Sequence, residues 1–570
     1  MNPLLEIQNL QVDFRSELGT ATAIKDISLR VNRGELLALV GESGSGKSVT
    51  SMSILRLLPQ KTAVYQNGKI LFSEDGNNTI DLLSLDNESI KRIRGNKVAM
   101  IFQEPMTSLN PVFTCGEQVA EAIRLHKKMT VSEAREATLA LFAQVKLPDP
   151  TSIFNRYPHQ LSGGQKQRVM IAMAMSCEPA LLICDEPTTA LDVTVQKTIL
   201  LLIKELQVSH QMGVIFITHD LAVVSEIADR AVVMYKGSIV EEGTVTKIFS
   251  RPEYPYTKAL IACRPSLYPK GTRLPVVADF IGSSTTETKK TTPITETNSF
   301  TKFGEVLIEA RGLSVLYPKE KNFWGKPVDY TKAVDNVDLS VFKGETLWLV
   351  CESGCGKTTL GRCLLKLIEP SGGQVLYNGE NLTEMSERNL RKLRKDIQIV
   401  FQDPYSSLNP SLTIEDALSE PLTVHGLTRS RSARKDKVVE LLEKVDMKAE
   451  HLRRYPHEFS GGQRQRIVIA RALILNPSFV VCDESVSALD VSVQAQVLNL
   501  LSDLKREMGF TILFISHDLS VVHYISDRIA VMQKGQIEEL GEASQVYSQP
   551  NSEYTKQLIA SIPGKPNQSR

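Results

Sequence analysis

Short apolar runs alternate along the whole chain with stretches of helical periodicity. A run of this kind, bounded by Gly or polar residues, is typical of a buried strand. The predicted strands are Leu36–Val40, Leu181–Cys184, Val214–Thr218, Leu347–Cys351, Phe479–Cys482 and Ile512–Ser516. Because these strands alternate with helical segments, the sequence predicts an α/β fold with a largely parallel sheet.

The second half of the chain repeats the first. Three motifs recur at one constant spacing: Gly-Gly-Gln at 163–165 and 461–463, Asp185-Glu186 and Asp483-Glu484, and His219-Asp220 and His517-Asp518. This spacing is much longer than the period of a solenoid, so it indicates two homologous domains in tandem. We place the first domain, with a C-terminal extension, at 1–265, a linker at 266–303, and the second domain, with a similar extension, at 304–570.

Within the linker, Ser283–Lys302 is rich in Thr and charged residues and nearly free of large apolar side chains. This composition is typical of a solvated connection between domains. A polar surface hairpin is the alternative interpretation, although the segment lacks the alternation of a strand pair.

Composition narrows the class of protein. The 570 residues carry a net charge of +1, with 42% hydrophobic and 23% charged residues, as in an ordinary globular chain. Such a balance gives no general attraction for nucleic acid or an anionic membrane, and we expect no nucleic-acid partner. No apolar stretch approaches the roughly 18 residues that span a bilayer, and the N-terminus lacks the pattern of a signal peptide. We therefore expect a chain that stays in the cytoplasm and crosses no membrane.

Eight cysteines are too few for a disulfide framework, and several lie in apolar runs, as reduced core thiols do. Cys351, Cys355 and Cys363 form the only cluster. Their spacing matches no common metal-ligand pattern, so a metal site is the weaker interpretation.

The strongest motif follows the first predicted strand. Gly41-Glu42-Ser43-Gly44-Ser45-Gly46-Lys47-Ser48 matches the GxxxxGK[ST] phosphate loop and precedes a helical stretch beginning at Val49. In such a loop the backbone amides surround the phosphates, Lys47 adds a positive charge, and the Ser48 hydroxyl can bind Mg²⁺. The sequence therefore predicts ATP and Mg²⁺ as cofactors.

The second loop reads Cys351-Glu352-Ser353-Gly354-Cys355-Gly356-Lys357-Thr358, followed by Thr359. Cys351 replaces the first glycine. If this position requires a positive φ, a Cβ there costs on the order of 1 kcal/mol, whereas in the β region the cost is small. Because Lys357, Gly356 and Thr358 are intact, we expect this loop to bind ATP as well.

Two acids end a later strand in each half. Asp185 and Asp483 can hold Mg²⁺ through water, while Glu186 and Glu484 can orient and polarise the attacking water. His219 and His517 close a further strand, where an imidazole can reach the terminal phosphate. A lone His is more often structural, but its recurrence in both copies favours a catalytic role.

A Ser-Gly-Gly-Gln turn starts a helix in each half, at Ser162-Gly163-Gly164-Gln165 and at Ser460-Gly461-Gly462-Gln463. A small turn at a helix start is a second anion-binding element without its own lysine. We call this Ser-Gly-Gly-Gln turn the signature. Each half also has a glutamine after the phosphate loop (Gln103, Gln402) and an Ala-Leu-Asp loop after the two acids (Asp192, Asp490). The order in both halves is phosphate loop, glutamine, signature, acidic strand end, Ala-Leu-Asp loop and histidine. This series resembles the ATP-binding-cassette family over nearly the whole chain.

The resemblance implies two tandem P-loop nucleotide-binding domains, each with a RecA-like core, a helical subdomain and a C-terminal extension. In that family two domains pack head to tail, so each phosphate loop shares one ATP with the signature of the other domain, here within one chain. The family's Mg²⁺ site maps onto Ser48, Gln103 and Asp185 and onto Thr358, Gln402 and Asp483. Phe14 and Tyr317 resemble the aromatic residue that stacks on adenine, although isolated aromatics are more often core residues.

Local features resemble one branch, the oligopeptide and dipeptide uptake ATPases. They are the segments from Gln103 to Pro111 and from Gln402 to Pro410, Tyr157-Pro158-His159 and Tyr455-Pro456-His457 before the signatures, and the tails at 253–258 and 553–556. The tails could instead be plain amphipathic surface helices.

This branch implies a fused ATP-hydrolysing subunit of a prokaryotic importer for peptides or peptide-like solutes, on the cytoplasmic face of the inner membrane. Its expected partners are two integral-membrane permease subunits, which dock between each glutamine and its signature, and an extracytoplasmic substrate-binding protein. A soluble tandem ATPase acting on ribosomes or DNA is the alternative class. Glutathione or nickel are alternative cargoes, since nothing in this chain selects the solute.

Overall fold

The computed structural model describes residues 2–16, 19–103, 108–189, 191–281, 304–321, 327–352, 354–428, 430–486, 489–516, 521 and 524–562. Its contacts group residues up to Ile261 into one compact unit, and Ala262–Asp279 with 304–562 into a second. The predicted linker segment Ser283–Lys302 lies outside the described residues.

A six-stranded sheet forms the centre of the first unit, in the order β10-β9-β3-β8-β7-β6. Its strands are β3 (Leu36–Val40), β6 (Val98–Ile101), β7 (Leu181–Asp185), β8 (Gly213–Thr218), β9 (Arg230–Tyr235) and β10 (Ser238–Thr244). All neighbours are parallel except β9 and β10. The predicted α/β fold with a largely parallel sheet is confirmed.

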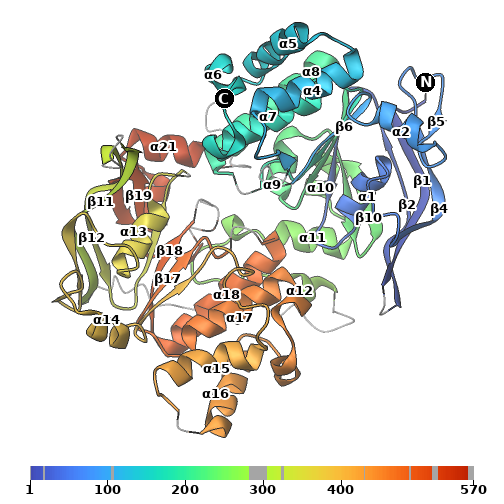
Figure 1. The fold of residues 1–570 in the computed structure, drawn as a ribbon. Coiled ribbons are helices and arrows are strands. Elements are labelled where there is room, and N and C mark those ends of the chain that lie inside the picture. The colour runs from blue at the N-terminus through green and yellow to red at the C-terminus, as the bar shows by residue number, and fades with distance from the viewer. Residues whose placement is uncertain are drawn as a thin grey trace. The chain divides into compact units, whose positions relative to one another are not determined.

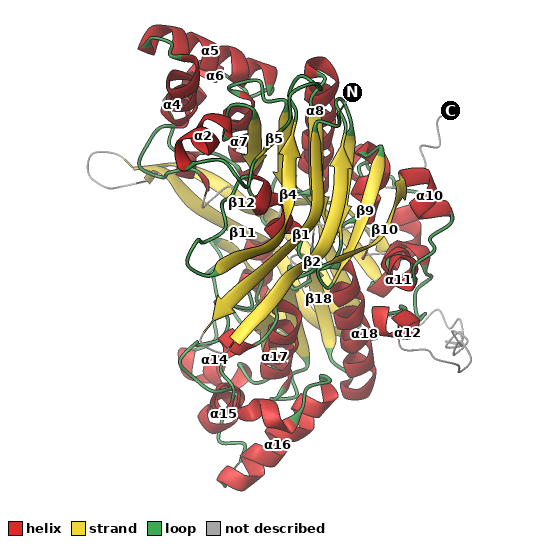
Figure 2. Cartoon of the chain, turned by 90° about the vertical axis from the view of Figure 1, so that its right-hand side faces the viewer, coloured by secondary structure: helices red, strands yellow, loops and turns green. Residues whose placement is uncertain are grey.

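An antiparallel sheet of order β2-β1-β4-β5 packs on one face of this parallel sheet, and helices cover the other. In β8, Ile215 and Ile217 belong to the core on the antiparallel side, whereas Val214 and Phe216 belong to the core on the helical side. This alternation fixes the register of the strand, because a shift of one residue would exchange the two faces. Figure 2 shows β1, β2 and β4 side by side.

The other elements of the first unit are β1 (Leu5–Ser16), β2 (Gly19–Val31), β4 (Ala63–Phe72), β5 (Ile80–Asp81), α1 (Lys47–Ile54), α2 (Asn87–Ile93), α4 (Cys115–Lys127), α5 (Val131–Gln144), α6 (Pro150–Phe154), α7 (Gly163–Met175), α8 (Val193–His210), α9 (Leu221–Ile227), α10 (Val245–Ser250) and α11 (Pro255–Ala262). Helices α4 to α7 form a separate group at one end of the unit (Figure 1). They correspond to the expected helical subdomain.

The second unit repeats this architecture with sheets of order β12-β11-β14-β15 and β16-β17-β18-β13-β19-β20. Its strands are β11 (Val306–Lys321), β12 (Pro327–Phe342), β13 (Thr346–Val350), β14 (Gly372–Tyr377), β15 (Glu380–Asn381), β16 (Ile397–Val400), β17 (Phe479–Asp483), β18 (Thr511–Ile515), β19 (Arg528–Gln533) and β20 (Gln536–Glu542). Its helices are α13 (Lys357–Leu364), α14 (Glu387–Leu393), α15 (Ile414–Val424), α16 (Arg431–Lys444), α17 (Gly461–Leu473), α18 (Val491–Met508), α20 (Ala543–Ser548) and α21 (Glu553–Ala560).

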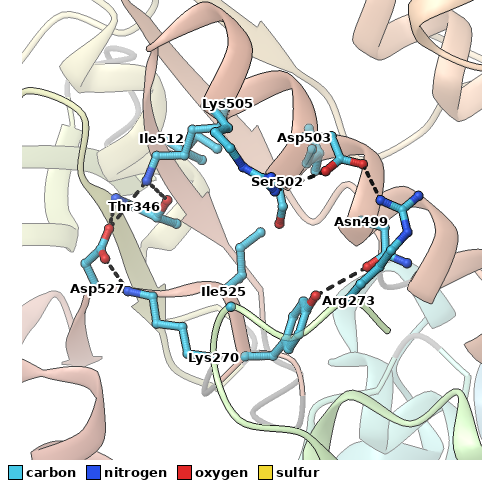
Figure 3. A pocket seen from close by; sticks show the side chains of 14 residues that line it. Lys270, Arg273, Thr346, Asn499, Ser502, Asp503, Lys505, Ile512, Ile525 and Asp527 are labelled. Atoms are coloured by element: carbon cyan, nitrogen blue, oxygen red, sulfur yellow. Dashed lines mark hydrogen bonds and ion pairs between the residues drawn. The ribbon is translucent and has the colours of Figure 1, made fainter. Parts of the chain in front are cut away.

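The segment after α11 folds as part of the second unit. Cys263 and Leu274 are buried in its core, and the Leu274 N–H donates to Asn499 Oδ1 at 3.0 Å while Asn499 Nδ2 donates back to the Leu274 carbonyl at 2.8 Å. Lys270 and Arg273 form ion pairs with Asp527 and Asp503 around a cavity of about 280 Å³ (Figure 3).

The sequence predicted a linker at 266–303, with its solvated part at Ser283–Lys302. The part of the linker that is described, up to the short helix α12 (Val277–Ile281), contains this packed segment. Among the described residues, no helix combines the length and the apolar character needed to cross a bilayer.

Candidate functional site

The first phosphate loop, 41–48, joins the end of β3 to the start of α1. Gly44 and Gly46 have φ angles of 78° and 104°, values that residues with a side chain rarely adopt. At Gly46 a Cβ would also lie 3.0 Å from the Ala23 carbonyl oxygen. The loop therefore needs glycine at position 46 both for its backbone angle and for space.

Lys47 turns back over this loop. Its Nζ donates to the carbonyl oxygens of Gly41 at 2.7 Å and Glu42 at 3.0 Å, and the side chain is nearly fully buried. Ser45 is buried too, and within the described part of the chain its Oγ has no hydrogen-bond partner. A buried ammonium and an unsatisfied hydroxyl in a loop of glycine amides fit an anionic ligand such as a phosphate group.

Asp185 lies beside the loop because β7 is parallel to the neighbouring strands, so their carboxyl ends meet at one edge of the sheet. Ser48 Oγ donates to Asp185 Oδ1 at 3.1 Å. The carboxyl group is 3% exposed, and this burial raises the pKa of Asp185 to about 6 although the Ser48 hydrogen bond opposes the shift. A buried carboxylate whose charge is this poorly compensated is suited to bind a cation.

Glu186 is held by side chains from three other segments. Its Oε2 accepts hydrogen bonds from Gln103 Nε2 at 3.1 Å and Thr189 Oγ1 at 3.0 Å, and its Oε1 lies 3.3 Å from His219 Nδ1. Burial acts to raise the pKa of Glu186, but the hydrogen bond and charge of His219, with the charge of Lys47, outweigh it and lower the pKa. The residue is therefore a fixed carboxylate at neutral pH, able to accept a proton or orient a water molecule.

The second site repeats these contacts. Lys357 Nζ donates to the carbonyl oxygens of the first two residues of its loop at 2.7 and 3.0 Å. Thr358 Oγ1 donates to Asp483 Oδ1 at 3.0 Å, and Gln402 Nε2 donates to Glu484 Oε2 at 2.7 Å. Burial raises the pKa of Asp483, as it does for its counterpart. The lysine, aspartate and glutamine contacts of the first site thus recur in the second.

The glutamates share an unusual backbone conformation. Glu186 and Glu484 both have φ of 47°, a left-handed value that costs of order 1 kcal/mol or more for a residue with a side chain. Ser485 follows the second glutamate where Pro187 follows the first, and this exchange leaves the φ of the glutamate unchanged. The predicted residues Ser353 and His517 of the second site lie outside the described residues.

The first position of the second phosphate loop, Cys351, does not require a positive φ. It is absent from the described residues with positive φ, so its Cβ is accommodated without the left-handed strain. Cys351 and Cys355 form a disulfide pair, a pairing that the sequence analysis did not predict. The other cysteines are buried and belong to no disulfide within the described residues: Cys115, Cys177, Cys184, Cys263, Cys363 and Cys482.

The signature residues cap helices in both halves. Ser162 and Ser460 are the N-caps of α7 and α17, and each exchanges hydrogen bonds of 3.1 and 3.3 Å with the glutamine three residues later. A Cβ on the second glycine of either signature would collide with a valine of the following helix, at 2.7 Å for Gly164 and 2.4 Å for Gly462. Both helix starts therefore present backbone N–H groups in a turn that tolerates no side chain at this position.

The remaining predicted residues are placed as follows. Asp192 is the N-cap of α8 and accepts a hydrogen bond from the Val195 N–H at 2.9 Å, and Asp490 is the N-cap of α18. Phe14 lies on β1, partly buried against the core, whereas Tyr317 on β11 is 41% exposed. Ser43, Val49, Gly354 and Thr359 belong to the two phosphate loops or the first turns of α1 and α13.

Sequence reasoning missed three features of these sites. It did not find Thr189 as a partner of Glu186, or the left-handed angle of the glutamates. It also missed Tyr256 of α11, whose hydroxyl accepts a hydrogen bond from the Glu42 N–H of the phosphate loop at 2.9 Å. The sequence held one indication of the Tyr256 contact, because the tail that contains this tyrosine recurs after both domains.

The raised pKa of Asp185 predicts a pH-dependent stability. Because the folded pKa of about 6 exceeds the ordinary value of 3.8, the folded state holds more protons between these values, and the free energy of unfolding falls as pH rises through them. Above pH 6 the buried charge of Asp185 lowers the free energy of unfolding by its full amount, about 3 kcal/mol. Asp185→Asn should therefore stabilise the nucleotide-free protein at pH 8 more than at pH 5.

Calorimetric melting of both proteins at the two pH values measures this difference. Asp436→Asn, at an exposed position of α16, serves as the control and should change stability little at either pH. An Asp185→Asn protein that is no more stable than the wild type at pH 8 would show that the carboxyl group carries no such penalty.

The fold and these sites define a class: a tandem pair of P-loop nucleotide-binding domains. The family described as ABC transporter matches residues 24–189 and 334–487, and the C-terminal region of oligopeptide/dipeptide transporters matches 240–286. The chain belongs to the ABC transporter family.

The relatives match over almost the whole chain. The glutathione import ATP-binding protein GsiA of Salmonella choleraesuis (strain SC-B67) is 49% identical over 98% of this chain and 89% of its own length. The protein of the same name from Escherichia coli (strain K12) is 48% identical over 100% of this chain and 91% of its own. Among solved structures, the ATP-binding cassette MJ0796 bound to ADP and Pi is 27% identical, covering 42% of this chain and 99% of its own, with a TM-score of 0.38.

These matches confirm several predictions. The chain is a fused tandem ATP-binding-cassette ATPase of the oligopeptide/dipeptide transporter group, and it has the expected α/β fold. It is an ATP hydrolase of the class that drives transport.

Proposed function

We propose that this chain is the ATP-hydrolysing subunit of an importer for glutathione or related peptide-like solutes. The observation that carries this proposal is the presence of the same lysine, aspartate, glutamine and glutamate contacts in both halves of a chain whose near full-length relatives are glutathione import ATP-binding proteins. Both halves then hydrolyse ATP, since each has a glutamate fixed beside its phosphate loop.

Each half binds the ATP phosphates through its loop amides and lysine. On binding, Lys47 exchanges its two carbonyl partners for phosphate oxygens. The hydroxyl of Ser48 and the carboxylate of Asp185, with Gln103, would hold Mg²⁺. These oxygen donors suit a hard cation, and the burial of the Asp185 carboxylate supports its presence. When bound, the ion would neutralise negative charge on the phosphate groups.

Glu186 and Glu484 orient the attacking water and accept its proton. For Glu186, the hydrogen bonds from Gln103 and Thr189 fix the carboxylate, and the neighbouring His219 keeps it ionised. We also assign to His219 a contact with the terminal phosphate of ATP. We assign the same roles to Gln402 and Glu484 in the second half.

The signature turns complete the sites. Because Ser162 and Ser460 each cap a helix that begins with two glycines, we propose that each signature binds the phosphates held by the phosphate loop of the other half. ATP then stabilises a closed pair of domains, and hydrolysis reopens it. Phe14 and Tyr317 are proposed to stack on the adenine rings.

Permease subunits dock between the glutamine and the signature of each half. In the first half, Val112 and Phe113 are 71% and 54% exposed just after Gln103. In the second, Ser407, Pro421 and His425 lie between Gln402 and the signature and line a groove. Exposed apolar side chains between the glutamine and the signature are suited to receive a short helix of a membrane partner.

Co-purification tests this proposal. The tagged chain, extracted with detergent from membranes of its own organism, should retain two multi-span permease subunits, and the complex should hydrolyse ATP faster with a solute-loaded binding protein. Recovery of ribosomal proteins or nucleic acid in place of permeases would replace the importer assignment by the soluble tandem ATPase class, with both ATP sites unchanged.

A further inference from the structure

The C-terminal extension of the first half contacts the phosphate loop directly. Tyr256, in the first turn of α11, is fully buried, and its ring packs on Tyr235 with 4.3 Å between the centroids. Its hydroxyl oxygen accepts a hydrogen bond from the Glu42 backbone N–H at 2.9 Å. A residue more than 200 positions away in sequence thus holds the second residue of the loop.

A buried carboxylate orients the helix that carries this tyrosine. Glu241 on β10 is 8% exposed, and its two oxygens accept hydrogen bonds from the N–H groups of Glu253 at 2.8 Å and Tyr254 at 3.1 Å. These are the N–H groups just before α11, where a helix has unsatisfied donors. The helix start, and with it Tyr256, is therefore fixed to the edge of the central sheet.

The second half has the same arrangement. Tyr554 of α21 accepts a hydrogen bond from the Glu352 N–H at 3.3 Å, and Glu539 accepts from the N–H groups of Asn551 at 2.9 Å and Ser552 at 3.1 Å. The bond to the loop is longer here, and Tyr554 is only partly buried. Because the arrangement recurs in both halves, an incidental contact is a poor explanation.

The tyrosine acts on the part of the loop that positions the lysine. The carbonyl oxygens of Gly41 and Glu42 are the acceptors of Lys47 Nζ, and the Glu42 N–H is the group that Tyr256 holds. The tyrosine thus fixes the backbone segment that aims the ammonium before ATP arrives. A loop that is already in its binding conformation loses less conformational freedom when ATP binds.

We propose that the C-terminal extensions are braces for the phosphate loops, with Tyr256 and Tyr554 as positioning residues that set the affinity for ATP. This inference rests on the proposed ATP-binding role and gives the extensions a function within it. Neither tyrosine takes part in the chemical step, so the brace affects binding and leaves the rate at saturating ATP unchanged.

The test uses Tyr256→Phe, which removes the hydroxyl and keeps the buried ring. In a full-length Lys357→Ala background, where only the first site retains its lysine, the dissociation constant for a fluorescent ATP analogue should rise about 3- to 10-fold, the range expected for one hydrogen bond. In the otherwise wild-type chain, KM for ATP should rise and kcat should stay constant. Tyr554→Phe, tested in a Lys47→Ala background, should have a smaller effect.

Tyr254→Phe is the matched control, because it removes a hydroxyl from the same segment but from a ring that is 40% exposed. It should leave ATP affinity unchanged. Glu241→Gln, which cannot accept both N–H groups, should weaken ATP binding in the same direction as Tyr256→Phe. A Tyr256→Phe chain with wild-type ATP affinity, or one whose kcat falls while KM is constant, would overturn the brace. Failure of the Lys357→Ala parent to bind ATP would instead contradict the proposed first site.

Discussion

Replacing both Glu186 and Glu484 with glutamine is expected to lower steady-state ATP hydrolysis roughly 10²- to 10⁴-fold, the usual contribution of a positioned acid–base group. The amide keeps the shape of the carboxylate and can still bond to Gln103 or Gln402. It cannot accept the proton of the attacking water. ATP binding should therefore persist, and gel filtration after incubation with Mg-ATP should recover the double variant with unhydrolysed nucleotide bound, in a closed state.

If both sites hydrolyse ATP, each single variant should have a hydrolysis rate between those of the double variant and the wild type. Glu136→Gln, at an exposed position of α5, is the control for the substitution itself and should hydrolyse ATP normally. Normal turnover by the double variant would refute the role assigned to both glutamates. Loss of bound ATP in that variant would indicate instead that the glutamates support nucleotide binding.

Lys47→Ala should weaken ATP binding at the first site on the order of 100-fold, because charge-assisted hydrogen bonds to phosphate are lost in a buried environment. Lys357→Ala should act on the second site by a similar factor, since the two ammonium groups have the same carbonyl contacts at 2.7 and 3.0 Å. Titration of each single variant with a fluorescent ATP analogue separates the two sites.

Lys61→Ala, which removes an exposed lysine of the same unit, provides the matched control and should bind ATP as the wild type does. If Lys357→Ala changed nothing, the second loop with its Cys351–Cys355 disulfide would not be a nucleotide site in this chain. Both lysines are therefore expected to bind ATP phosphates.

The fold was predictable because its signals are local. Each predicted strand differs from the observed one by a single residue at most at either end, as for Leu181–Cys184 against Leu181–Asp185, because an apolar run closed by a charged or glycine residue marks both ends of a buried strand. The contacts of Lys47, Ser48, Asp185 and Gln103 follow from motifs that come directly after parallel strands, because the carboxyl ends of such strands meet at one edge of the sheet.

Contacts between distant segments were not predictable. No spacing rule relates Tyr256 to Glu42, because the pairing depends on how α11 packs against the sheet. The left-handed φ of Glu186 likewise follows from tertiary contacts, including the hydrogen bond of its N–H to the Ile217 carbonyl at 3.0 Å. The disulfide between Cys351 and Cys355 depends on the curvature of the loop, which brings the two Cα atoms to 6.5 Å. Sequence spacing alone does not specify that distance.

Uptake of labelled glutathione tests the central claim, that ATP hydrolysis at these two sites drives import. Cells lacking this chain should regain uptake when the wild-type chain is supplied, and should not regain it with the chain carrying Glu186→Gln and Glu484→Gln at the same expression level. Equal uptake with the two chains would show that import proceeds without hydrolysis at either site.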